Sequence, residues 1–239
     1  MRPQNRTVSF LLLFILLFLP SQLQAASFLK YFTFSEKGVL KLWKEKIHKG
    51  QVEYKIIHKP EEAYVHAHSK QAASGIFYEF ADNERYNPTQ KPYISWKWKV
   101  NKFPKKNPTE PQDDYAARVY VIFPASVFIF SRCIEYVWDD TLPEGTMKKS
   151  PLTAKIKIFV IRKGKKEGWV QEERNIFEDY MKAFDEEEVD DEIGAVAFMS
   201  DTDDTESEAV TLFDEMKIGY SKPLQKEKRL RFRYHRYHS

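Results

Sequence analysis

Residues 93–100, with the sequence YISWKWKV, decide the fold class of this 239-residue chain. Apolar residues at positions 94, 96, 98 and 100 alternate with serine and lysine at positions 95, 97 and 99. Successive side chains of a strand point to opposite faces, so this segment has one apolar face and one polar face. A two-residue period is typical of a strand with one buried face and one solvated face. We therefore expect both tryptophans of the segment to face the core.

The same period recurs along most of the chain. It is less regular in AARVYVIF, residues 116–123, where Arg118 lies on the more polar face. Turn-forming residues such as Asn-Pro and Pro-Glu-Gly separate many of these stretches. Many short strands with such turns predict an all-β sandwich or barrel. Further strand-like stretches are QVEYKII, AYVHAHS, SGIFYEF, CIEYVW, AKIKIFVI, WVQEERNIF, EIGAVAFM and AVTLFDEMKI.

Two segments have helical periodicity. GVLKLWKEKIHKG, residues 38–50, places apolar residues at helical spacing and ends on a glycine, which is a common helix stop. NIFEDYMKAFDEEE, residues 175–188, gathers its aromatic residues and methionine on one helical face. We expect one or two short helices beside the strands.

The first 25 residues have the layout of a secretory signal peptide. Arg2 and Arg6 precede an unbroken apolar run from Phe10 to Leu19, and a small residue, Ala25, lies at the expected cleavage position. The run is shorter than the roughly 20 residues that span a bilayer. We expect cleavage near Ala25 and a periplasmic or secreted protein; an uncleaved anchor is the alternative.

Charge and length divide the rest of the chain into two parts. Residues 26–220 are enough for one all-β domain and carry a net negative charge. Residues 221–239 hold seven Lys/Arg against one Glu, interleaved with aromatic residues. This basic tail could contact an anionic envelope surface, or it is a solvated, frayed terminus. With an export signal, nucleic acid is not an expected partner.

An acidic, hydroxyl-rich loop, SDTDDTE, occupies residues 200–206. Asp201 and Asp203 offer oxygen ligands at alternate positions, which suits calcium. The EF-hand spacing is not met, because Glu206 stands where that loop needs glycine. Asp201 and Asp203 are therefore candidate calcium ligands, although the pattern requires no cofactor. The alternative is a solvated turn whose side chains cap backbone N–H groups.

Charged residues interrupt otherwise apolar strands. Arg118 follows Asp114 by four positions, and Glu173 and Arg174 interrupt another strand. A buried charge costs free energy unless it is paired or hydrated. One interpretation is a buried ion pair, such as Arg118 with Glu173 or Asp201. The other is a ligand-binding face where Arg118 grips an acidic or hydroxyl group.

Motifs of several enzyme classes are missing from the sequence. There is no G-x-S-x-G, no H-E-x-x-H and no glycine-rich phosphate loop, and the single cysteine excludes an internal disulfide. A glycosidase needs two carboxylates roughly 5–10 Å apart. The chain has many carboxylates, but no spacing singles out a pair.

An ordered set of stretches resembles the bacterial exported family called Domain of Unknown Function 3047. The resemblance implies a periplasmic β-sandwich similar to the jelly-roll domains often used for carbohydrate binding, and it implies no activity. The family pattern TDTDNT followed by Gly is altered here at Ser200, Asp204 and Glu206. The set covers about residues 40–220 and comprises LWKEKIHKGQVEY, AASGIFYEF, YISWKWKV, DDYAARVYVIF, YVW, EERNIFEDYMKAFDEE and GAVAFMSDTDDTESEAVTLFDEMKI.

Together these patterns predict a jelly-roll-like β-sandwich, similar to a carbohydrate-binding module, with one or two short helices. We expect a non-catalytic binding module for an envelope glycan or another polar ligand, in which Trp138 stacks on the ligand. The alternatives are a glycan-active enzyme with paired carboxylates and a structural or docking protein of the cell envelope. The candidate ligand-binding residues are Asp114, Arg118, Trp138, Glu173, Arg174, Asp201 and Asp203.

Overall fold

The alternating segment around Trp96 forms strand β6 (Tyr93–Lys102), and its predicted apolar face is buried. Trp96 and Trp98 are fully buried, while Lys97 on the opposite face is partly exposed. The structure is a computed structural model that describes residues 28–107, 109 and 112–222. The two-residue period therefore identified which side of β6 faces the core.

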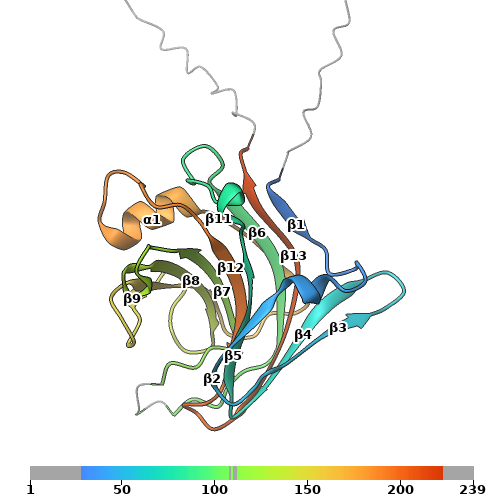
Figure 1. The fold of residues 1–239 in the computed structure, drawn as a ribbon. Helices are drawn as coiled ribbons and strands as arrows, with labels where there is room; N and C mark the ends of the chain where they lie inside the picture. The colour runs from blue at the N-terminus through green and yellow to red at the C-terminus, as the bar shows by residue number, and fades with distance from the viewer. Residues whose placement is uncertain (1–27, 108, 110–111, 223–239) are drawn as a thin grey trace, which may run out of the picture.

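Strand β6 belongs to a six-stranded antiparallel sheet, called sheet A (Figure 1). Its order is β11-β6-β13-β4-β3, and β1 also pairs with β13. Its long strand β13 pairs on both sides, with β6 and with β4, and so lies at the centre of the sheet. The other strands of sheet A are β1 (Lys30–Phe32), β3 (Glu53–His58), β4 (Ala63–Lys70), β11 (Val170–Asn175) and β13 (Glu208–Tyr220).

The second sheet, sheet B, has seven strands in the order β2-β5-β12-β7-β8-β10-β9. Only the β8–β10 pair of this sheet is parallel. Neighbours in the sheet come from distant parts of the sequence, as the pairing of β5 with β12 shows. The strands are β2 (Lys44–Lys49), β5 (Ala73–Glu79), β7 (Ala117–Phe123), β8 (Arg132–Asp139), β9 (Met147–Lys149), β10 (Ile156–Lys163) and β12 (Ala195–Asp201). The mostly β, two-sheet sandwich expected from the sequence is confirmed.

Aromatic side chains join the two sheets. Phe198 of β12 stacks on Phe213 of β13, with ring centroids 4.6 Å apart, and Trp96 of β6 lies 5.4 Å from Tyr136 of β8. A buried aromatic ring removes 150–250 Å² from water and makes a large contribution to core stability. The high aromatic content is therefore explained first by the core.

The predicted helix at residues 175–188 is confirmed as α1 (Ile176–Phe184). The Asn175 side chain caps it by accepting a hydrogen bond from the Glu178 N–H at 3.2 Å. None of the described helices combines the length and hydropathy needed to cross a bilayer. The predicted signal peptide and all of the basic tail except Ser221 and Lys222 lie outside the described residues.

The prediction of a helix at residues 38–50 is wrong. The chain forms a short 3₁₀ turn, η1 (Val39–Leu42), and then the edge strand β2. Ile47, whose spacing suggested a buried helical face, is 52% exposed on that strand. Pairing with β5 supplies the backbone hydrogen bonds of β2, and charged residues are typical of a sheet edge. Two further 3₁₀ turns are η2 (Asp82–Glu84) and η3 (Phe128–Phe130).

Candidate functional site

Arg118 lies in a closed group of ion pairs, which we call the Arg118 cluster. Its Nε donates to Asp201 Oδ1 at 2.8 Å, and its Nη2 donates to the second oxygen of the same carboxylate. Its Nη1 donates to Glu135 Oε1 at 2.5 Å, and its Nη2 also reaches the Asp113 carbonyl. Arg118 is only 5% exposed. Two buried carboxylates therefore share one buried guanidinium.

Tyr115 covers this cluster. The Arg118 guanidinium lies 4.5 Å from the centre of the Tyr115 ring, and the Lys106 Nζ lies 4.4 Å from it. Tyr115 is 1% exposed and belongs to a small apolar cluster with Val137, Ile158 and Val160. Because the ring is packed on that cluster, the Arg118 side chain is separated from solvent. Arg118 lines neither of the two pockets described below.

Burial raises the pKa values of the two carboxylates in the cluster. Desolvation raises the pKa of Asp201 to about 7 and also raises the pKa of Glu135, while Arg118 opposes both shifts. The ion pair that the sequence suggested between Arg118 and Asp201 is present, but Glu173 is not part of it. Glu135 was missed, although its position inside the apolar stretch CIEYVW was a usable signal.

The acidic loop and the segment just before β7 cap each other's backbone. Oxygens of Asp114, Asp201 and Asp203 lie within 4.8 Å of one another. The Asp114 carboxylate accepts from the N–H groups of Asp204 at 3.3 Å and Thr205 at 2.7 Å. The Asp201 Oδ1 accepts from the Tyr115 N–H at 3.0 Å in addition to Arg118. Donors therefore occupy oxygens of Asp114 and Asp201, while the Asp203 carboxylate lies 4.0 Å from the Lys49 Nζ, and calcium at Asp201 and Asp203 stays a prediction.

Trp138, Glu173 and Arg174 are not members of the Arg118 cluster. Trp138 is fully buried, and its Nε1 donates to the Gly164 carbonyl at 2.8 Å, so its ring offers no free face for a ligand. Glu173 accepts from the Tyr220 hydroxyl at 2.8 Å. Arg174 forms a two-pronged ion pair with Asp179 in α1. The structure thus unites Asp114, Arg118, Asp201 and Asp203 but not these three residues.

A pocket of about 350 Å³ lies elsewhere, against the polar face of β6 and β13. No sequence pattern indicated it, because its walls come from five separate segments. We call it the acidic pocket. Its lining residues are Tyr31, Thr33, Ser35, Glu61, Glu62, Ala63, Lys97, Trp169, Asp214 and Glu215.

An irregularity in β13 places two adjacent carboxylates at this pocket. Asp214 pairs with Lys97 of β6, but the next pair is Lys217 with Ser95, so β13 has one extra residue between them. Glu215 in this bulge has a positive φ of 47°. A regular strand would turn one of two neighbouring residues toward the core, and bulges redirect such side chains. Here both Asp214 and Glu215 line the pocket.

The carboxylates of the pocket differ in their partners. Asp214 Oδ1 is buried without a hydrogen-bond partner among the described residues, and burial raises the Asp214 pKa to about 6. Glu215 accepts from the Lys97 Nζ at 2.6 Å. Glu62 accepts from the Trp169 Nε1 at 3.3 Å. The pocket therefore combines acceptors, a lysine donor and aromatic surface, since Tyr31 is 44% exposed.

Comparisons with known proteins identify a family but no activity. The family model described as Protein of unknown function (DUF3047) matches residues 41–217. A search of curated proteins found no match.

Several solved structures show a distant likeness. The CBM22-1 xylan-binding domain of Paenibacillus barcinonensis Xyn10C has 13% identity and a TM-score of 0.41, covering 83% of this chain and 97% of that chain. The mannan-recognising module TmCBM27 has 8% identity and a TM-score of 0.35, covering 83% and 99%. A cellulase derived from Cel12A of Rhodothermus marinus has 10% identity and a TM-score of 0.39, covering 75% and 100%. At these scores, none of the three indicates a ligand for this chain.

Proposed function

This chain belongs to the DUF3047 family, and we propose that it is an exported, non-catalytic module that binds an envelope glycan or another polar ligand. The acidic pocket is the binding site in this proposal. The observation that carries it is an open pocket with the partly exposed rings of Tyr31 and Trp169 beside Asp214, Glu215 and Lys97. Ligand sites of this kind combine apolar surface with a few convergent polar groups.

Each wall of the pocket matches one feature of a sugar. Carboxylates accept hydrogen bonds from sugar hydroxyls, and the Lys97 ammonium donates to their oxygens. The rings of Tyr31 and Trp169 supply flat apolar area against which the C–H groups of a sugar pack. Glu62 and Glu215, which line the pocket, supply such acceptors beside Asp214.

The test is calorimetric titration with oligosaccharides of defined composition: chito-, cello-, xylo- and manno-oligosaccharides. We expect one of them to bind saturably and the Trp169→Ala variant to bind it at least tenfold more weakly. Asp82→Asn, which changes an exposed aspartate outside the pocket, serves as the control and should leave the affinity unchanged. Binding that is absent across the panel, or insensitive to Trp169→Ala, would refute the proposal.

A glycan-active enzyme is the second candidate, and Asp214 is the observation that favours it. A general acid must hold its proton near neutral pH, and burial raises the Asp214 pKa to about 6 beside a second carboxylate, Glu215. Chromatography of each oligosaccharide after prolonged incubation separates the two functions. New reducing ends that disappear in Asp214→Asn support the enzyme, and an unchanged bound oligosaccharide supports the binding module.

The proposal of export depends on the signal-peptide pattern in residues 1–25. The proposed contact with the envelope depends on the basic tail, residues 221–239. We expect fractionation of expressing cells to recover a chain that begins after Ala25 in the periplasm or the medium. A docking protein of the envelope would instead follow the membrane fraction, and deletion of residues 221–239 would release it. Recovery of the uncleaved chain in the cytoplasm would refute export.

A further inference from the structure

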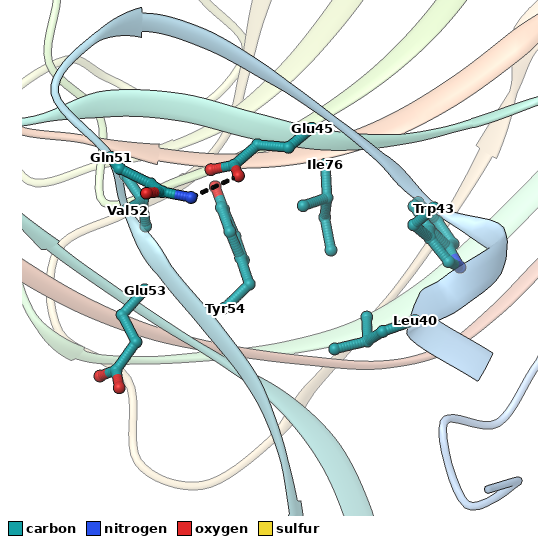
Figure 2. A pocket seen from close by; sticks show the side chains of 8 residues that line it. All are labelled: Leu40, Trp43, Glu45, Gln51, Val52, Glu53, Tyr54 and Ile76. Atoms are coloured by element: carbon teal, nitrogen blue, oxygen red, sulfur yellow. Dashed lines mark hydrogen bonds between the residues drawn. The ribbon is translucent and has the colours of Figure 1, made fainter. Parts of the chain in front are cut away.

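A second pocket, of about 480 Å³, lies where the edge strand β2 of sheet B approaches the edge strand β3 of sheet A (Figure 2). We call it the inter-sheet pocket. It shares no lining residue with the acidic pocket. Among the described strands, β2 and β3 are the outermost strands of their sheets on this side. Its lining residues come from η1, β2, β3, β5 and the turn that joins β2 to β3.

The inter-sheet pocket has one polar end and one apolar end. Figure 2 shows the Glu45 carboxylate, the Gln51 amide and the Tyr54 hydroxyl gathered at one end. Leu40 and Trp43 lie at the other end of the same view. An amphipathic ligand of matching length would place its polar group at Glu45 and its apolar body toward Trp43.

The Glu45 carboxylate is held in place at the polar end. Its Oε1 accepts from the Ser74 hydroxyl at 2.9 Å, and its Oε2 accepts from the Gln51 amide at 2.7 Å. The Tyr54 hydroxyl donates to the Ser74 carbonyl at 2.5 Å, which fixes the neighbouring ring. A carboxylate has about four lone-pair positions, so two remain for a ligand. The acceptor is therefore oriented before any ligand arrives.

The charge of the pocket selects the ligand class. Glu45 and Glu53 line it, and no lysine, arginine or histidine is among the described lining residues. An anionic ligand would meet repulsion, whereas an ammonium group would gain a charge-assisted hydrogen bond to Glu45. The Tyr54 ring, at the same end as Glu45, favours a cation over an anion because its face is electronegative.

Trp43 forms the apolar end of the pocket. Trp43 is 7% exposed, and its indole N–H has no hydrogen-bond partner among the described residues. The Nε1 atom is enclosed, so Trp43 contributes apolar ring surface to the pocket and no donor.

We propose that the inter-sheet pocket binds an organic ammonium compound with an apolar body, whose charge pairs with Glu45. The proposal does not depend on glycan binding in the acidic pocket. Either site can fail its test without affecting the other, because the two tests use different ligands and different variants.

The experiment compares three probes that share one apolar body: 3-phenylpropylamine, 3-phenylpropan-1-ol and 3-phenylpropanoate. Titration at pH 7.5 is followed by calorimetry, and folding of each variant is checked by its melting temperature. We expect the amine to bind saturably and at least tenfold more tightly than the alcohol, and the carboxylate to bind most weakly. Equal affinities of amine and carboxylate, or no saturable binding of the amine, would overturn the proposal.

Two matched variants assign the effect to the pocket. Glu45→Gln keeps the side-chain shape and removes the charge, so it should abolish the preference for amine over alcohol. Glu79→Gln makes the same change on an exposed residue of β5 outside the pocket, and the preference should persist. If Glu45→Gln binds the amine as tightly as the unmodified protein does, the amine is held elsewhere and the proposal fails.

Discussion

The Arg118 cluster and the acidic pocket are both groups of charged side chains on β-strands, yet only the second borders a cavity. In the cluster, the guanidinium is 5% exposed and meets two carboxylates beneath the Tyr115 ring. In the pocket, Asp214, Glu215 and Lys97 line a cavity. The enclosed guanidinium, paired with two carboxylates and absent from the lining of both pockets, marks the cluster as structural. The charged groups of the acidic pocket instead border a space that a ligand can enter.

The two regions also differ in how their buried charges are compensated. Removing a charge from water is expensive, and in the Arg118 cluster ion pairs and hydrogen bonds offset part of that cost. Desolvation nevertheless raises the pKa of Asp201 to about 7, and it raises the pKa of Asp214, which forms no ion pair among the described residues, to about 6. Two experiments test this contrast and two test the acidic loop, with expected effects that decrease in that order.

The largest loss of folding stability is expected from Arg118→Met. This change leaves Asp201 and Glu135 buried without their shared cation, which typically costs about 3–5 kcal/mol. The measurement is the free energy of unfolding from urea denaturation. Arg85→Met is the control, since Arg85 pairs with an exposed aspartate and should lose less than about 1 kcal/mol. Equal losses in the two variants would show that the cluster is not structural.

The second effect concerns pH. The folded-state pKa of Asp214 is about 6 against an ordinary value of 3.8, so between about pH 4 and 6 the folded state holds more of this proton than the unfolded state. Stability from this group is therefore present at low pH and falls as pH rises through that window, by at most about 1.4 kcal/mol per pH unit.

Asp214→Asn removes this titration. Subtracting the stability of the variant from that of the unmodified protein at each pH should give a difference that declines between about pH 4 and 6. Asp82→Asn changes an exposed carboxylate and should give no such decline. A flat difference for Asp214→Asn would mean that the carboxylate is solvated, and the contrast with the cluster would weaken.

The third effect is a modest gain in folding stability from a change in the acidic loop. Glu206 has a positive φ of 46°, at the position where the family pattern has glycine. Glycine adopts this backbone conformation without steric cost, so Glu206→Gly should raise stability by about 0.5–1 kcal/mol. Glu206→Ala keeps the strain and is the control. A gain in the alanine variant as large as that in the glycine variant would assign the effect to charge rather than backbone.

The smallest effect is expected from calcium. Arg118 and backbone N–H groups occupy the oxygens of Asp201 and Asp114, so 5 mM calcium or a chelator should leave the melting temperature unchanged. A stabilisation that grows with calcium concentration and disappears in Asp203→Asn would overturn this assignment, because a cation that binds the folded state raises its stability.

Much of the fold could be predicted from local pattern. The alternation in β6, the helix α1 and the family resemblance were read correctly, because each depends on spacing within one segment. The segment at residues 38–50 was misread, because an edge strand needs no buried face and its spacing happened to match a helix. Trp138 was misjudged as a ligand platform, since neighbouring aspartates do not reveal that other strands cover its ring.

The candidate sites were less accessible to sequence reasoning. Arg118 and Asp201 were paired correctly, because two charges in apolar strands need each other. Neither pocket was foreseen. The acidic pocket joins residues as distant as Tyr31 and Glu215, and the inter-sheet pocket depends on how two sheet edges diverge.

By itself, the sequence determined the strands, the class of fold, the family and the charges that require a partner, because periodicity and desolvation act at the level of the individual residue and strand. Only the tertiary structure decided which charges close on one another and which border a cavity. That outcome depends on sheet pairing, on the bulge at Glu215 and on the packing of Tyr115, which bring together segments far apart in the chain.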